Sequence, residues 1–309
     1  MTIKKTATSF MALMGYLTIA GIISFRGMTL AAEEESGRWF FADVGLWGGY
    51  YGGSSEDYYL MKGTADAIFQ FSMIEAVAGY TRYQHYQVTD GNGNYGYADV
   101  NHLKAAVTVT PGEMLEITAG YRYYIGTRSY NAHLANGGIS VLLDSVTIGA
   151  TFQWKMEKYE FMRSDFENYY IDAAASVGYD ISDRTGVEAE FTHGREDFEG
   201  SILYYSNLLR LGFYHYPLEK FLVGAGITGG ADSADYAIFG AELSLGWIPL
   251  EGLTISLYGF YNYYAYQGKE STTKTKVTRS TRVNPRTDPS LEGESFGSWG
   301  FSLGATYRI

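Results

Sequence analysis

The residues of this chain that could do chemistry are charged side chains placed at every second position of otherwise apolar segments. In segment 186–195, for example, Glu188 and Glu190 alternate with three apolar residues. Successive side chains of a β-strand point to opposite faces, so the two carboxylates share one face. Comparable positions elsewhere carry the acids Asp43, Asp66, Glu75, Glu116, Asp172 and Glu242 and the bases Lys62, Lys104, Arg122, Lys155, Arg210 and Arg308. Charged groups arranged in this way select ions electrostatically when they line water.

Other candidate motifs lack the context that their chemistry needs. The segment Gly224–Gly229 has the glycine spacing of a dinucleotide-binding turn, but no βαβ unit is predicted around it. The segment Asp90–Asn101 begins like a calcium-binding loop, yet Tyr95 stands where such a loop requires glycine. Because the chain has no cysteine, disulfides, thiol catalysis and cysteine-based metal sites are excluded. The sequence therefore predicts neither a cofactor nor a metal site.

A serine–histidine pair is the catalytic arrangement that the sequence leaves open. His193 with Ser201, or His102 with Ser140, could form such a pair. No local motif singles out either pair, and we therefore predict that the protein is not an enzyme.

The segment Phe296–Ile309 shows most clearly which elements must position the charged side chains. Its apolar residues alternate strictly with small or polar ones; the apolar face holds Trp299, Phe301, Leu303, Ala305, Tyr307 and Ile309. A strand with an apolar outer face and a small or polar inner face is typical of a barrel in lipid. The 38 glycines and 29 tyrosines, against five prolines, also suit a barrel, since tyrosine favours the lipid–water interface.

The same alternation recurs along the chain and predicts fourteen strands, with twelve or sixteen as the alternatives. They cover about 39–51, 59–71, 73–86, 98–109, 114–125, 132–143, 146–157, 168–179, 186–195, 202–216, 221–229, 236–248, 253–267 and 296–309. Short turns alternate with longer polar connections, and closure would pair the first strand with the last. The predicted fold class is all-β, a transmembrane antiparallel up-and-down β-barrel. A soluble β-sandwich is the rival fold.

Residues 1–32 are predicted to be a secretory signal peptide. Lys4 and Lys5 precede a mostly apolar stretch, 10–25, and small residues precede the predicted cleavage point. An uncleaved anchor is the alternative, but the stretch is short for a membrane span of about 20 residues. We therefore divide the chain into a signal peptide, 1–32, and an outer-membrane barrel, 33–309.

The end of the chain resembles the C-terminal signature of bacterial outer-membrane β-barrel proteins. Ser302, Gly304, Tyr307 and Ile309 match its polar residue, its glycine and its two hydrophobic positions, although the family usually ends in Phe. The resemblance implies an outer-membrane location, contact with membrane lipid and recognition of the last strand by the barrel-assembly machinery.

At the level of pattern, the chain after residue 32 resembles monomeric 14-strand porins. That resemblance implies a monomer through which small hydrophilic solutes or ions diffuse passively. The alternative is a non-conducting barrel that acts as a surface adhesin or a membrane-bound hydrolase.

The charge balance predicts which ions such a pore prefers. The chain has a formal charge of −11, and the signal peptide holds three cations and no acid, so its removal leaves −14. An acidic chain of this kind lacks the electrostatic footprint of a nucleic-acid-binding protein. Its lumen would attract cations. Fourteen strands leave more room than small barrels, so we predict a water-filled pore rather than a plug of salt-bridged side chains.

The longest predicted connection, 268–295, carries the opposite charge. Its cations are Lys269, Lys274, Lys276, Arg279, Arg282 and Arg286, and only Glu270 opposes them between positions 268 and 287. We predict that this loop folds into the mouth of the acidic barrel and gates it. A solvated loop, or a hairpin that binds anionic lipopolysaccharide, is the alternative.

Overall fold

The computed structural model describes residues 39–53, 58–89, 95–112, 114–127, 129–161, 164–198, 201–233, 235–267 and 295–309. They form the strands β1 (Phe40–Gly53), β2 (Tyr58–Phe71), β3 (Ile74–Thr89), β4 (Tyr95–Val109), β5 (Leu115–Gly126), β6 (Asn131–Leu143), β7 (Val146–Phe161), β8 (Ser164–Ser182), β9 (Thr185–Phe198), β10 (Ser201–Leu218), β11 (Phe221–Asp232), β12 (Tyr236–Leu250), β13 (Leu253–Tyr266) and β14 (Phe296–Arg308). Each predicted strand has its counterpart, which confirms the all-β prediction and the count of fourteen. The predicted signal peptide, 1–32, lies outside the described residues. Among those residues no helix is long and apolar enough to cross a membrane.

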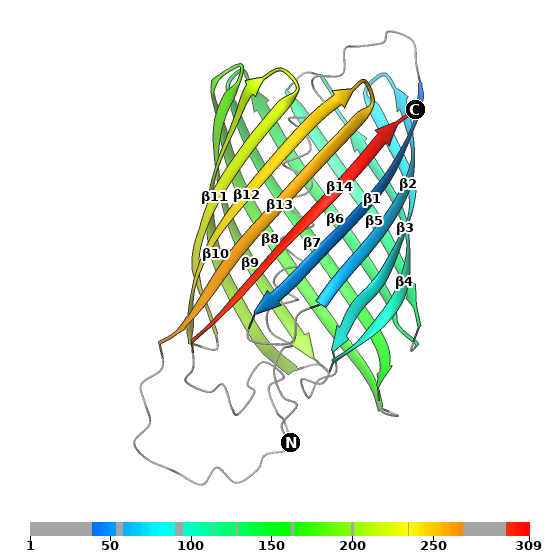
Figure 1. Ribbon diagram of the computed structural model, residues 1–309, viewed down its shortest axis with the longest axis vertical. Coiled ribbons are helices and arrows are strands. Elements are labelled where there is room, and N and C mark those ends of the chain that lie inside the picture. The colour runs from blue at the N-terminus through cyan, green and yellow to red at the C-terminus, as the bar shows by residue number, and fades with distance from the viewer. Residues whose placement is uncertain are drawn as a thin grey trace.

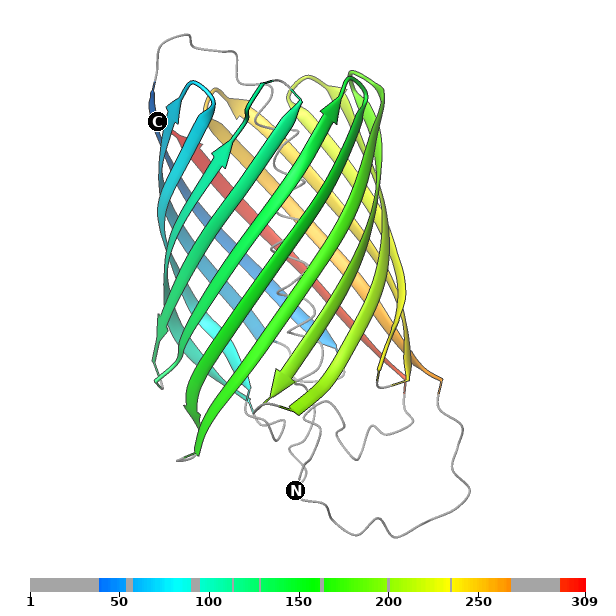
Figure 2. The same cartoon turned by 180° about the vertical axis from the view of Figure 1, so that it is seen from behind.

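The strands close into one antiparallel barrel in which each pairs with its neighbours in the chain (Figure 1). β1 pairs with β14, as predicted, and Asp43 lies opposite Arg308 at the seam. Arg308 donates two hydrogen bonds of 2.8 Å to the two carboxylate oxygens of Asp43. Because β1 to β14 close on one another, none of these described strands has a free edge, which is the condition for a sheet in lipid. The view from behind shows the same tilted wall continuing around the barrel (Figure 2).

Short turns join the strands at one end of the barrel, where the C-terminus also lies (Figure 1). Ser72 and Asp144 adopt positive φ angles of 52° and 34° in two of these turns. Gly252, with φ of 76°, lies in a third short turn. A Cβ added there would lie 2.6 Å from the backbone oxygen of Arg308. Glycine is therefore required at position 252 both by the backbone angle and by the closeness of β14.

Several strands are longer than their sequence patterns indicate. β3 and β4 pair through Thr89 and Tyr95, so most of the predicted loop 87–97 belongs to strands. β8 reaches Ser182, which shortens the predicted turn 180–185 to two residues. The pattern underestimates these strands because backbone pairing continues past the lipid band, where alternation between apolar and polar residues is no longer demanded.

The outer face of the barrel is apolar. Val44 and Leu46 of β1, Ile148 and Phe152 of β7, and Leu303 of β14 are among many large apolar side chains that are exposed. Aromatic groups gather near both ends of this band: Trp39 stacks with Phe69 and Phe71, with ring centroids 6.3 and 6.2 Å apart, and Tyr50 lies 5.6 Å from Trp299. An exposed apolar band flanked by aromatic girdles fits a lipid bilayer.

Candidate functional site

Within the described strands, the alternation that exposes the apolar residues turns the predicted charged residues to the inside. In β2, for example, Lys62 and Asp66 alternate with outward Met61 and Ala65. The remaining predicted positions are inward by the same test: Asp43, Glu75, Lys104, Glu116, Arg122, Lys155, Asp172, Glu188, Glu190, Arg210 and Glu242. Their role as a pore lining stays a prediction.

A basic arc, made of Lys62, Lys104 and Arg122, lies near the middle of β2, β4 and β5. Lys104 and Arg122 are directly paired across β4 and β5. The Nζ atom of Lys104 lies 2.7 Å from Oδ2 of Asp66 on β2, so this pair reaches across the intervening β3. It crosses β3 at Gly79, where a Cβ atom would collide with Asp66 and would lie 2.5 Å from Cε of Lys104. The inner-face glycine therefore lets the two charged side chains lie flat against the wall.

An acidic arc, made of Glu188, Glu190 and Glu242, lies near the middle of β9 and β12. Arg210 of β10 forms ion pairs with both Glu188 and Glu242. The hydroxyl of Tyr258 donates a 2.8 Å hydrogen bond to Glu242. Here too glycines make room: a Cβ at Gly226 of β11 would lie 2.6 Å from Oε1 of Glu242. The single guanidinium bridges two of three carboxylates and leaves the arc negative.

The two arcs lie on opposite walls, because β2–β5 and β9–β12 are separated by intervening strands on both sides of the closed barrel. The three cations of the basic arc are opposed by one carboxylate, that of Asp66. The three carboxylates of the acidic arc are opposed by one cation, that of Arg210. The lumen is thus polarised across its width, which a count of charges along the chain does not reveal.

The other predicted residues lie nearer the two ends. Glu75 accepts a 3.0 Å hydrogen bond from Gln70 near the short turns, where Glu116 also lies. Toward the longer connections Lys155 pairs with Glu157 at 2.6 Å, and Asp172 accepts a 3.4 Å hydrogen bond from Gln153. These groups extend the charged wall but belong to neither arc.

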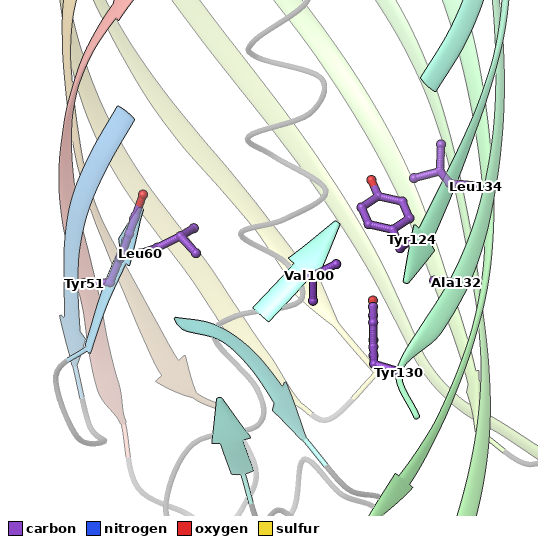
Figure 3. Close-up of a cluster of buried hydrophobic side chains, with 7 residues drawn as sticks. All are labelled: Tyr51, Leu60, Val100, Tyr124, Tyr130, Ala132 and Leu134. Carbon is purple, nitrogen blue, oxygen red and sulfur yellow. The ribbon is translucent and has the colours of Figure 1, made fainter. Parts of the chain in front are cut away.

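Buried apolar and aromatic residues also face the lumen, and the sequence reasoning missed them. One set, the β1–β6 apolar cluster, consists of Tyr51, Leu60, Val100, Tyr124, Tyr130, Ala132 and Leu134 (Figure 3). A second set on the opposite side consists of Leu208, Tyr236, Ile238, Tyr264 and Phe296. Both lie toward the longer connections. The available signal was local loss of alternation, as in Tyr58-Tyr59-Leu60-Met61, where both faces are apolar.

The structure does not bring together the serine–histidine pairs. His102 pairs with Thr81 and Tyr124, whereas Ser140 pairs with Glu116 nearer the short turns. His193 is hydrogen-bonded to Asn207 on the outward face. Within the described ranges no three His, Cys, Asp or Glu residues are grouped to hold a metal ion.

The remaining predicted motifs give no site either. Gly224–Gly229 lies within β11, which leads into β12. The first residues of the calcium-like segment, 90–94, and the basic residues of loop 268–295 lie outside the described residues.

Comparisons with solved structures agree with this geometry. The chain is similar to the CymD monoaromatic hydrocarbon channel, with 9% identity over 93% of this chain and 92% of that one, at a TM-score of 0.58. It is also similar to the Pseudomonas putida toluene transporter TodX, with 8% identity over 91% of each chain, at a TM-score of 0.51. The chain has the fold of a bacterial outer-membrane β-barrel. Its sequence matches no protein-family model and no curated protein.

Proposed function

We propose that this outer-membrane barrel is a passive channel for small hydrophilic solutes and ions. The observation that carries the proposal is the pair of opposed charged arcs around mid-strand. Large side chains on the inner face lie against glycines of neighbouring strands, as Trp47 does against Gly304 and Glu242 against Gly226. A barrel of this strand number is wider than those that side chains fill, so side chains folded onto the wall favour a water-filled lumen.

The polarised lumen gives this channel its mechanism. A small cation is attracted to the acidic arc and an anion to the basic arc, while a solute with separated charges is oriented between them. Inward acids outnumber inward bases over the whole described wall, so we propose that cations pass more readily than anions. CymD and TodX, described as a hydrocarbon channel and a toluene transporter, lend support only through their shared fold.

Electrical recording from the folded protein in planar bilayers tests this function. We expect discrete conductance steps and, across a KCl gradient, a reversal potential of the sign that denotes cation preference. Folded protein that inserts without producing steps would contradict the channel and favour a surface adhesin or a hydrolase. Steps with anion preference would retain the channel and refute the proposed selectivity.

A further inference from the structure

The β1–β6 apolar cluster lies immediately beside the basic arc on the same wall. Leu60 and Lys62 are successive inward residues of β2, and Arg122 and Tyr124 are successive inward residues of β5. Leu134 of β6 is the direct partner of Arg122. One wall of the lumen therefore offers an apolar surface that ends at cationic groups, and we call it the β2–β6 wall.

The cationic part of this wall is only partly neutralised. Lys104 is paired with Asp66 at 2.7 Å. The Nζ atom of Lys62 lies 4.8 Å from the ring centroid of Trp47. Within the described part of the chain it forms no ion pair with a carboxylate, although the charge of Asp66 attracts it. Arg122 likewise has no ion-pair partner there, and the three cations repel one another. An anion that entered the lumen would relieve this repulsion.

His102 supplies an independent observation. Its side chain lies between Tyr124, with ring centroids 4.5 Å apart and planes at 7°, and Tyr83, at 6.3 Å. The residue is only 4% exposed. Among the described residues neither of its ring nitrogens has a hydrogen-bond partner. Buried polar atoms are nearly always hydrogen-bonded, and an imidazole N–H can donate to a carboxylate.

The aromatic rings of the apolar part favour a flat ligand body. Tyr51 stacks on Tyr58 at 5.2 Å and 21°, Tyr124 presents its ring beside His102, and Val100 and Leu134 lie nearby. Figure 3 shows Tyr51 and Leu60 at one side of the cluster, Tyr124 and Tyr130 at the other and Val100 between them. Aromatic rings pack favourably against such side chains in offset or edge-to-face arrangements.

We propose that the β2–β6 wall binds a small organic anion with an aromatic body, its ring against the apolar cluster and its carboxylate toward Arg122, Lys62 and His102. The inference rests on the proposed function in one respect, that solutes enter the lumen. Among the described residues the opposite wall does not offer this combination, because its charges near Leu208 and Ile238 are predominantly carboxylates.

Calorimetric titration of the folded protein in detergent with four probes tests the site without requiring conduction. Benzoate carries both the ring and the carboxylate, acetate lacks the ring, benzyl alcohol lacks the charge, and benzylammonium reverses it. We expect benzoate to bind at least about tenfold more tightly than each of the other three. Equal affinity for benzoate and acetate, or for benzoate and benzyl alcohol, would overturn the proposal.

Variants assign the binding to this wall. Combining Lys62→Gln with Arg122→Gln should weaken benzoate binding about tenfold or more and leave the weak binding of benzyl alcohol unchanged. His102→Phe should keep the stack on Tyr124 and weaken benzoate binding severalfold. Lys220→Gln, in the exposed turn between β10 and β11, is the matched control for loss of a cation. Unchanged benzoate affinity in the double variant would place the binding elsewhere and refute the site.

The two proposals fail separately. Benzoate binding without conductance steps would support the binding site and refute the channel function. Conductance steps without benzoate binding in the wild-type protein would support the channel function and refute the binding site. The four-probe comparison uses the wild-type chain. It can therefore refute the proposal even if a variant fails to fold.

Discussion

The basic and acidic walls of the lumen differ in how completely their charges are paired. Arg210 is held between Glu188 and Glu242 and has a side chain only 11% exposed. On the basic wall only Lys104 has a carboxylate partner among the described residues, Asp66, and its side chain is 27% exposed. The acidic wall is therefore a cross-linked structural network, whereas the basic wall keeps cations available to a solute. Strand alternation decides which face a charge takes, and pairing decides whether it serves the fold or the ligand.

The largest expected difference follows from removing one cation from each wall. Arg210→Met removes the cation that pairs with Glu188 and Glu242, whose side chains are largely shielded from solvent. It should lower the free energy of unfolding by about 3–5 kcal/mol. Lys104→Met leaves only Asp66 unpaired, so the loss should be about 1–3 kcal/mol. Urea unfolding of both variants in the same lipid or detergent, followed by tryptophan fluorescence, measures the two losses. Equal losses would show that the walls do not differ in pairing.

The second expected effect concerns the alternation on which both walls depend. Phe152 of β7 is on the outward face and lies further from the strand end than Ile148 does, so Phe152→Arg should cost about 2–4 kcal/mol, the value near the bilayer midplane. Thr151 of the same strand faces inward, and Thr151→Arg should be tolerated. Folding into lipid vesicles, assayed by the mobility difference between folded and heated protein on gels, measures both. A comparable loss at the two positions would contradict the assigned facing.

The barrel could be predicted from the sequence because its determinant is local. A period of two needs only neighbouring residues, and every predicted strand was found. Strand ends were less accurate, as in β3 and β4, because backbone pairing outside the lipid band has no periodic signal. The apolar cluster was missed for a related reason: where both faces are apolar, as at Leu60 and Val100, alternation disappears.

The polarity of the lumen could not be predicted, because it depends on register and closure. Alternation within each strand indicates which charges face inward, but their grouping into two opposed arcs follows from which strands lie across from one another. Contacts between strands that are not neighbours cannot be predicted from a local sequence pattern either. Asp66 and Lys104 meet only because Gly79, on the strand between them, has no side chain.

The third prediction separates the two walls by ion selectivity. Replacing Glu188, Glu190 and Glu242 together by Gln should move the reversal potential toward anion preference. The opposite change on the other wall, which removes two cations by Lys62→Gln with Arg122→Gln, should move the reversal potential toward stronger cation preference. A unit charge acts with about 1 kcal/mol at 4 Å in water, so severalfold changes in the permeability ratio are expected. Shifts of the same sign in both variants would refute the polarised lumen.

The smallest expected effects come from the glycines that let side chains cross neighbouring strands. Gly226→Ala places a Cβ against Glu242, which Arg210 and Tyr258 hold in place, so the crowding should cost about 1–3 kcal/mol. The Cβ that Gly79→Ala adds would instead contact the flexible ends of the Asp66 and Lys104 side chains. These can move apart, and the loss should be about 1 kcal/mol or less, the typical contribution of an accessible ion pair.

Gly229 of β11 is the control, since a Cβ there would have no atom of the described residues within 4 Å. Gly229→Ala should stabilise the protein by about 0.4–1 kcal/mol through the unfolded chain. The Gly79 variant has a further consequence that stability alone does not report. Once Lys104 separates from Asp66, another cation of the basic arc becomes available, so benzoate should bind more tightly than to the wild-type protein. The Gly226 variant should leave benzoate affinity unchanged. If Gly79→Ala weakens benzoate binding, then the Lys104–Asp66 pair is part of the ligand site rather than a competitor for its charge.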